Sequence, residues 1–177
     1  MTDFMVSGSF GELIEPATLK IERVLPGPIE RVWDYLTESN LRRQWLASGD
    51  IANRVGADFE LTWHNDELTN PPGKRPEGFG DQHSAVCRLL EYDPPHILSY
   101  TFGKHGEVIF TLAPQGDEVL LTLVHRRMPD PAIMFMVGPG WHAHLDILVA
   151  KMRGLNAAPF WDSWVQLKAE YAKRLPG

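Results

Sequence analysis

The sequence predicts one α+β domain in which an antiparallel sheet packs against a long helix near the C-terminus. Three observations support this fold class. A chain of 177 residues with 44% hydrophobic content is large enough for one well-covered core. Its middle contains five segments with strand-like composition, separated by turns rich in Gly, Pro and Asp. Apolar residues at helical spacing occur both before and after these segments.

The first part of the chain predicts an extension, then a strand and two short helices. Residues 1–16 are treated as an N-terminal extension in which only a short leading strand forms. β-branched residues at 18–24, and the stop at Pro26-Gly27-Pro28, favour a strand. A helix then begins at Pro28, and a second short one is capped by Thr37 or Ser39. The first helix has one apolar stripe, formed by Ile29, Val32, Trp33 and Leu36.

The sheet is expected to form from strands in series, at 57–64, 82–92, 96–102, 107–112 and 118–126. Short turns such as 93–95 and 115–117 join the later strands, so consecutive strands should pair as an antiparallel meander. The segment 65–80 is different, because it is too long and too rich in Pro and Gly for a tight hairpin. Both a lid over a binding site and an ordinary surface loop remain open for it.

A long amphipathic helix is expected from Gly140 onward. At about 100° per residue, its inner face consists of Trp141, Leu145, Leu148, Met152 and Leu155. Asp146, Ala150 and Arg153 are expected to point away from that face. A last helix begins at Pro159, and its apolar residues are Phe160, Trp164, Leu167 and Tyr171. Residues 17–177 are therefore expected to form a single domain.

Composition argues against several classes of function. The formal net charge of −6 argues against a nucleic-acid partner. No segment approaches the roughly 18 apolar residues of a membrane helix, and the start does not resemble a signal peptide. Cys87 is the only cysteine, so the chain alone builds neither a disulfide nor a thiolate zinc cluster. We therefore expect a cytoplasmic protein without a membrane partner.

The order of the predicted elements is that of the helix-grip fold. In this fold a curved antiparallel sheet wraps around a long C-terminal helix, and two short helices follow the first strand. Several segments also resemble one branch of the SRPBCC superfamily, the activator of heat shock protein 90 ATPase. These segments are Ile21-Glu22-Arg23-Val24-Leu25-Pro26, Val32-Trp33-Asp34-Tyr35-Leu36-Thr37, Gln44-Trp45-Leu46, Glu91-Tyr92-Asp93-Pro94-Pro95-His96-Ile97-Leu98-Ser99-Tyr100 and Gly140-Trp141. The resemblance covers nearly everything from about residue 9 to the end.

The resemblance implies a helix-grip domain and a range of functions. The wider superfamily includes START-like lipid-transfer domains, plant pollen allergens, polyketide cyclases and the chaperone activator that names the branch. That activator carries an additional N-terminal domain with no counterpart in this sequence. We therefore do not expect a chaperone partner.

Candidate ligand-contacting residues follow from the hollow of such a sheet. One face of each strand and the stripe of the long helix would enclose a cavity walled by large apolar side chains. The candidates are Trp45, Phe59, Leu61, Trp63, Tyr100, Phe102, Phe110, His125, Trp141, His144, Leu145 and Leu148. We expect them to bind a small hydrophobic molecule in a carrier, sequestering or sensing role. A filled core without a cavity is the alternative, because aromatic rings fill space as readily as they wall it.

Polar residues give no catalytic, metal or cofactor motif, so none of these is predicted. His142 and His144 form an H-x-H pair, but residues two apart on a helix diverge by roughly 200° and cannot readily share one ion. His144 borders the apolar face, as a structural histidine or as a group that contacts the ligand. If the cavity recognises a carboxylate or a phenol, Arg88, His125 and Tyr100 are further candidates. A surface salt bridge is the alternative for Arg88.

Two other functions remain open. A polyketide cyclase-like or dehydratase-like enzyme would use His144, His125 or Tyr100 to move protons. A protein-interaction module, including a homodimer, would expose an apolar patch at residues 128–136 or on the final helix.

Overall fold

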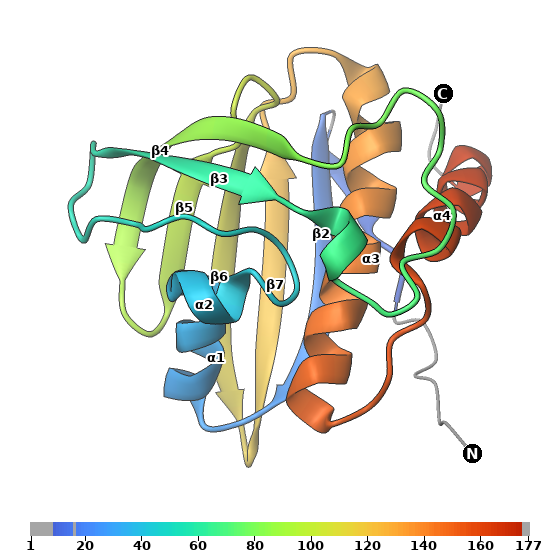
Figure 1. The fold of residues 1–177 in the computed structure, drawn as a ribbon. Coiled ribbons are helices and arrows are strands. Elements are labelled where there is room, and N and C mark those ends of the chain that lie inside the picture. The colour runs from blue at the N-terminus through green and yellow to red at the C-terminus, as the bar shows by residue number, and fades with distance from the viewer. Residues whose placement is uncertain (1–8, 16, 175–177) are drawn as a thin grey trace.

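The computed structural model describes residues 9–15 and 17–174. Residues 1–8, 16 and 175–177 lie outside it, and with them more than half of the extension expected at 1–16. Seven strands form one curved antiparallel sheet around a long helix, which confirms the predicted α+β helix-grip fold (Figure 1). The strands are β1 (Glu12–Glu15), β2 (Thr18–Pro26), β3 (Asp58–Trp63), β4 (His83–Asp93), β5 (Ile97–Thr101), β6 (Glu107–Gln115) and β7 (Glu118–Arg126). The helices are α1 (Ile29–Thr37), α2 (Ser39–Arg42), α3 (Met134–Arg153) and α4 (Phe160–Arg174), with short 3-10 helices η1 (Asn65–Glu67) and η2 (Pro131–Ile133).

The sheet has the strand order β1-β2-β7-β6-β5-β4-β3. Strands β3 to β7 pair with their neighbours in sequence, as the meander predicts. Strand β2 pairs with β7, so the first long strand adds to the last one. Strand β1 pairs with β2 and forms the edge of the sheet beyond it.

Strand register places the apolar residues of the middle strands on one face of the sheet. Leu98 lies opposite Phe110, and Phe110 lies opposite Leu123. Tyr100 and His125 likewise both lie opposite Val108. All of these side chains are buried, at no more than 1% exposure. Because side chains alternate along a strand, this register determines which face points toward α3, a choice that the sequence pattern left open.

Helix α3 begins at Met134, so the predicted start at Gly140 is wrong. Pro139 lies inside the helix, where it cannot donate the usual backbone hydrogen bond. The first turns nevertheless pack well, since Met134, Gly138 and Pro139 are buried. A Cβ atom at Gly138 would lie 3.4 Å from the Tyr171 ring, so α4 approaches α3 closely here. This packing outweighs the lost hydrogen bond.

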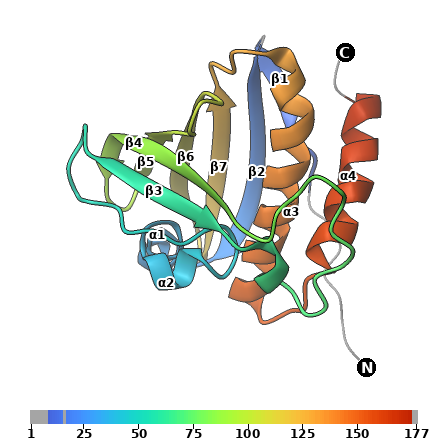
Figure 2. The ribbon, with the colours of Figure 1, turned by 45° about the horizontal axis from the view of Figure 1, so that its top comes forward.

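Helix α3 is covered on two sides, which changes the predicted pattern of its faces. Figure 2 shows α4 lying along α3 on the side away from the sheet. Ala150, which we predicted to point away from the core, is buried. On the same helix face, Asp146 pairs with Arg23 of β2 (3.0 Å) and Arg153 donates to the Val24 carbonyl of β2 (3.0 Å). Leu155, predicted to continue the inner face, lies beyond the helix and is 40% exposed. The helix ends at Arg153 because Gly154 adopts a left-handed conformation.

Within the described ranges, none of the helices combines the length and the hydropathy that crossing a membrane requires.

Candidate ligand cavity

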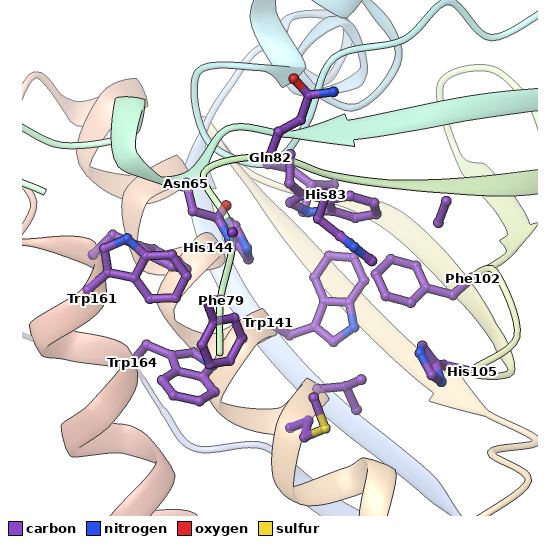
Figure 3. A pocket seen from close by; sticks show the side chains of 18 of the residues that line it. Asn65, Phe79, Gln82, His83, Phe102, His105, Trp141, His144, Trp161 and Trp164 are labelled. Carbon is purple, nitrogen blue, oxygen red and sulfur yellow. The ribbon is translucent and has the colours of Figure 1, made fainter. Parts of the chain in front are cut away.

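A cavity of about 340 Å³ lies at one end of the molecule, where α3 and α4 approach the loop between β3 and β4 (Figure 3). This size lies within the range of small-molecule sites. Seven of its twenty lining residues are Trp or Phe, namely Trp63, Phe79, Phe102, Trp141, Phe160, Trp161 and Trp164. Apolar and small residues add to it, namely Leu46, Ala85, Met136, Val137, Gly78, Gly80 and Gly140. The polar residues along it are Asn65, Asp81, Gln82, His83, His105 and His144.

The structure brings only part of the predicted cavity residues together around this space. Those that line it are Trp63, Phe102, Trp141 and His144. The others are buried in the adjoining core and do not line it: Trp45, Phe59, Leu61, Tyr100, Phe110, His125, Leu145 and Leu148. The hollow of the sheet is thus filled by side chains at its middle, and the open space lies toward the N-terminal part of α3. Ligand contact by any of these residues stays a prediction.

Several cavity residues were not among the sequence candidates. Phe160, Trp161 and Trp164 come from α4, which the sequence predicted as a helix but did not place at the cavity. Phe79 comes from the loop at 65–82, where it is an isolated aromatic residue between Gly78 and Gly80. That local pattern was the signal in the sequence, because an aromatic residue in a polar loop usually packs against something.

The loop is attached to the first turn of α4 by hydrogen bonds. The backbone N–H of Phe160 donates to the Thr69 hydroxyl (3.0 Å), and that of Trp161 donates to the Pro72 carbonyl (2.9 Å). The Trp161 indole N–H donates to Asp66 (2.7 Å). Helix N-termini have backbone donors without intrahelical partners, and the loop supplies their acceptors here. The loop is therefore a fixed wall of the cavity along this part.

Two glycines with positive φ shape the loop, and one of them allows it to approach α4 closely. Gly73 has φ +85°, and a Cβ atom on it would lie 2.8 Å from a carboxylate oxygen of Asp162. The neighbouring Lys74 backbone N–H donates to the same carboxylate. Further along, Gly78 has φ +92° with open space around it. It leads into Phe79, whose ring packs 5.3 Å from that of Trp161 between centroids.

His144 is the polar group held most firmly inside the cavity. It is 6% exposed, and its Nδ1 lies 2.8 Å from the Trp45 carbonyl. Burial lowers the pKa of His144 to about 4, so the ring is neutral near pH 7. A carbonyl only accepts, so Nδ1 carries the proton and Nε2 presents a lone pair. The structure gives Nε2 no hydrogen bond to any described residue.

The Trp45 carbonyl is itself held by the turn that follows α2. The Trp45 indole N–H donates to the Tyr35 carbonyl (2.8 Å). Arg42, which is fully buried, donates to the carbonyls of Ala47 (3.1 Å) and Thr37 (3.0 Å), among others. Burial lowers the pKa of this guanidinium. Arg42 therefore stabilises the turn after α2, in which the Trp45 carbonyl orients His144. The sequence analysis did not predict this role.

His125 does not line the cavity but supports its wall through hydrogen bonds. The Trp141 indole N–H donates to its Nδ1 (3.0 Å), and its Nε2 lies 2.6 Å from the His105 carbonyl. Both ring nitrogens are thus used when the ring is neutral, with the proton on Nε2. Burial lowers the pKa of His125 to about 4, which keeps it neutral. The histidine fixes Trp141 relative to the turn at residues 103–106.

The two histidines of the H-x-H pair diverge, as their spacing predicts. The Nδ1 of His142 lies 2.9 Å from the Tyr171 hydroxyl on α4, and its Nε2 lies 3.4 Å from Asp146. His144 instead approaches Trp45 across the core. Among the residues that the structure describes, no group of three or more His, Cys, Asp or Glu could hold a metal ion.

The other polar candidates lie away from the cavity. Arg88 is exposed and pairs with Asp58 (3.0 Å), so the salt-bridge alternative applies to it. The Tyr100 hydroxyl is buried and has no hydrogen-bond partner in the described chain. Burial raises the pKa of Tyr100, which disfavours its ionised form.

The segments considered for an exposed apolar patch are largely covered. Met128 and Met134 are buried, whereas Met136 is 55% exposed. Most of the large apolar residues of α4 are buried, namely Phe160, Trp161, Trp164, Leu167 and Tyr171, whereas Val165 is 50% exposed.

Comparison with known proteins gives the family. The family model described as Activator of Hsp90 ATPase homolog 1-like protein matches residues 26–153. No curated protein matches the chain. The chain is similar to the solution structure of the protein encoded by gene BPP1335 from Bordetella parapertussis, with 35% identity and a TM-score of 0.80. That match covers 98% of this chain and 97% of the other.

Two further solved structures share the fold at lower identity. The crystal structure of CalU16 from Micromonospora echinospora is 22% identical, with a TM-score of 0.66 over 93% of this chain and 94% of that one. A conserved protein of unknown function, EF2215 from Enterococcus faecalis, is 19% identical, with a TM-score of 0.65 over 90% and 86%. The family match extends from the end of β2 to the end of α3 and so covers most of the fold. The chain therefore belongs to the Activator of Hsp90 ATPase homolog 1-like family, within the SRPBCC superfamily.

Proposed function

We propose that this protein binds a small hydrophobic molecule in the cavity between α3, α4 and the loop at 65–82. The role would be that of a cytoplasmic carrier, sequestering protein or sensor. The cavity supports this proposal because it combines an aromatic wall with few polar groups inside it, which is the usual character of small-molecule sites.

Gly140 is the observation that carries the proposal. It lies within α3 and lines the cavity, and a Cβ atom built on it would meet nothing within 4 Å. Glycine inside a helix costs roughly 0.5 to 1 kcal/mol relative to alanine. Packing therefore does not require glycine at this position, and stability would favour a larger residue. A glycine here keeps the cavity open, as expected if a ligand occupies that space.

The structure gives less support to the two alternative functions. Of the three groups expected to move protons in a cyclase-like enzyme, His144 lines the cavity, whereas His125 and Tyr100 lie outside it. For an interaction module, Met128, Met134 and most large apolar residues of α4 are buried, and the exposed apolar residues of these segments include Met136 and Val165. We include no cofactor, nucleic acid, membrane or chaperone in the proposal, in line with the composition of the chain.

A thermal-shift screen tests the proposed function. The panel contains neutral aromatic compounds, sterols, fatty acids and polyketide mimics. A ligand that binds only the native state raises stability by about 2.7 kcal/mol at a hundredfold excess over Kd. We expect a saturable rise for one chemical class. Intrinsic fluorescence should change with it, because four of the six tryptophans line the cavity. A panel without any saturable response would contradict the proposal.

A further inference from the structure

The polar groups of the cavity indicate which hydrophobic molecules it selects. Resting on the proposed function, we infer that the ligand is a neutral aromatic compound with a hydroxyl or N–H group that donates a hydrogen bond to Nε2 of His144. The inference concerns the chemical class of the ligand and makes His144 the residue that determines specificity.

The direction of the hydrogen bond follows from the attachment of the His144 ring. Its Nδ1 donates to the Trp45 carbonyl, and Trp45 is held in place by the hydrogen bond from its indole N–H to the Tyr35 carbonyl of α1. Rotation of the ring would break this bond and leave a buried carbonyl without its donor, which is unfavourable. Nε2 therefore remains an acceptor. The ligand must therefore supply the hydrogen-bond donor.

The second inner polar residue is Asn65, whose side-chain oxygen is not accessible from the cavity. Asn65 is half-buried at the start of η1, and its side-chain oxygen is buried without a hydrogen-bond partner in the described part of the chain. In contrast, the remaining polar residues lie at the exposed rim, namely Asp81, Gln82, His83 and His105. Nε2 of His144 is therefore the inner acceptor that carries the inference, and a ligand with a donor gains a hydrogen bond there that a hydrocarbon cannot form.

Charge argues against an acidic ligand. None of the described residues that line the cavity is Lys or Arg, and Asp81 adds a carboxylate at the rim. A carboxylate transferred into such a site would lose its hydration without gaining a cation or a donor at His144. Fatty acids and aromatic acids are therefore disfavoured relative to neutral compounds.

The aromatic side chains around the cavity favour a ligand with a flat aromatic ring. The ring centroids of Trp141 and Phe102 lie 5.1 Å apart, and those of His144 and Phe160 lie 4.8 Å apart. Figure 3 shows Phe79, Trp161 and Trp164 gathered on one side of the cavity, with Phe102 on the other. Aromatic side chains on both sides suit stacked or edge-to-face contacts with an aromatic ligand.

A matched set of four compounds tests the inference with the unaltered protein. The compounds are 2-naphthol, 2-methylnaphthalene, 2-methoxynaphthalene and 2-naphthoate, titrated at pH 7 with tryptophan fluorescence and calorimetry. The methyl compound has the size of the naphthol but no polar group, and the methoxy compound has an oxygen without a hydrogen. We expect 2-naphthol to bind about tenfold more tightly than either, as one hydrogen bond to a buried acceptor provides. The naphthoate should bind most weakly.

Two variants identify the acceptor. His144→Phe keeps a ring of similar size but removes Nε2, so 2-naphthol should lose its roughly tenfold advantage while 2-methylnaphthalene binds as before. His96→Phe is the matched control, because His96 is exposed in the turn between β4 and β5 and does not line the cavity. This variant should leave the ratio between the two compounds unchanged. Should His144→Phe fail to fold, the four titrations of the unaltered protein still decide the question.

The outcomes separate this inference from the proposed function. Tightest binding of the naphthoate or the methoxy compound, or an unchanged ratio in His144→Phe, would overturn the donor preference while the cavity still binds ligands. Failure of all four compounds would overturn the inferred ligand class. The proposed function would fall only if the wider panel also gave no saturable response.

Discussion

At the scale of single residues, the buried polar groups orient the cavity walls. His125 receives the indole N–H of Trp141, and the Trp45 carbonyl fixes His144. The sequence grouped both histidines as candidates for ligand contact, since each lies among apolar residues. Periodicity does not reveal which ring nitrogens are already used by the protein. Only the three-dimensional contacts distinguish the wall-supporting His125 from His144 in the cavity.

Replacement of His125 by phenylalanine tests its supporting role. His125→Phe leaves the Trp141 indole N–H buried without an acceptor, which should lower the free energy of unfolding by about 1 to 3 kcal/mol. Urea denaturation measures this change. His105→Ala is the control, because it removes an exposed side chain and keeps the carbonyl that contacts His125. Equal stability of His125→Phe and the unaltered protein would contradict the assignment.

The same two histidines predict a dependence of stability on pH. Burial lowers the pKa of both His125 and His144 from 6.5 to about 4. Between these values the unfolded chain binds protons that the folded protein does not, so stability falls as pH decreases through this window. The loss approaches roughly 3 kcal/mol for each ring near pH 4. It is absent above about pH 7, where both states are neutral.

Denaturation at several pH values between 7 and 5 checks this expectation. This range limits the contribution of carboxylates, which titrate mainly at lower pH. The variant His125→Phe should show a shallower decline than the unaltered protein, because one of the two groups is gone. A stability that does not change over this range would mean that the histidines are not buried in neutral form.

At the scale of elements, the sequence predicted what depends on local periodicity. The β3 to β7 meander, the two short helices and the last helix all appear. The predicted cap of the second helix by Thr37 or Ser39 is wrong, because Glu38 is the N-cap residue and no side chain caps α2. The start of α3 was missed, because Pro139 and its flanking glycines indicate a break when read locally. Contact between Gly138 and the Tyr171 ring is a tertiary effect, and no window of the sequence contains both residues. The segment 65–80 was set apart as a long loop and lies within the connection between β3 and β4, but its attachment to α4 could not be derived.

Glycine at position 73 is expected to be required for that attachment. Gly73→Ala combines an unfavourable left-handed backbone with a clash against Asp162. It should therefore weaken the loop by at least about 1 kcal/mol more than Gly78→Ala, which has a similar φ but open space. Amide hydrogen exchange at Trp161 and Lys74 measures the effect, because both amides are bonded across this contact. Similar exchange rates in the two variants would contradict this view of the loop.

At the scale of the whole molecule, the location of the cavity was the part that the sequence could not provide. Alternation along the strands marked Trp63 and Phe102, which line the cavity at the end of β3 and just after β5. The same alternation also marked Phe59, Tyr100 and Phe110, which fill the middle of the hollow. Where the space stays open depends on how α4 and the loop pack over α3. That arrangement follows from contacts distant in sequence.

The measurement that tests the central claim most directly is ligand binding by variants of Gly140. Calorimetry compares the unaltered protein, Gly140→Ala and Gly140→Leu, with the compound that gives the largest saturable shift in the screen. Both substitutions remove the cost of a helical glycine, so neither should lower stability, but only leucine fills the space in front of Gly140. The account predicts binding by Gly140→Ala close to that of the unaltered protein and a loss of about tenfold or more in Gly140→Leu. Equally tight binding by a folded Gly140→Leu variant would show that the ligand does not occupy this cavity.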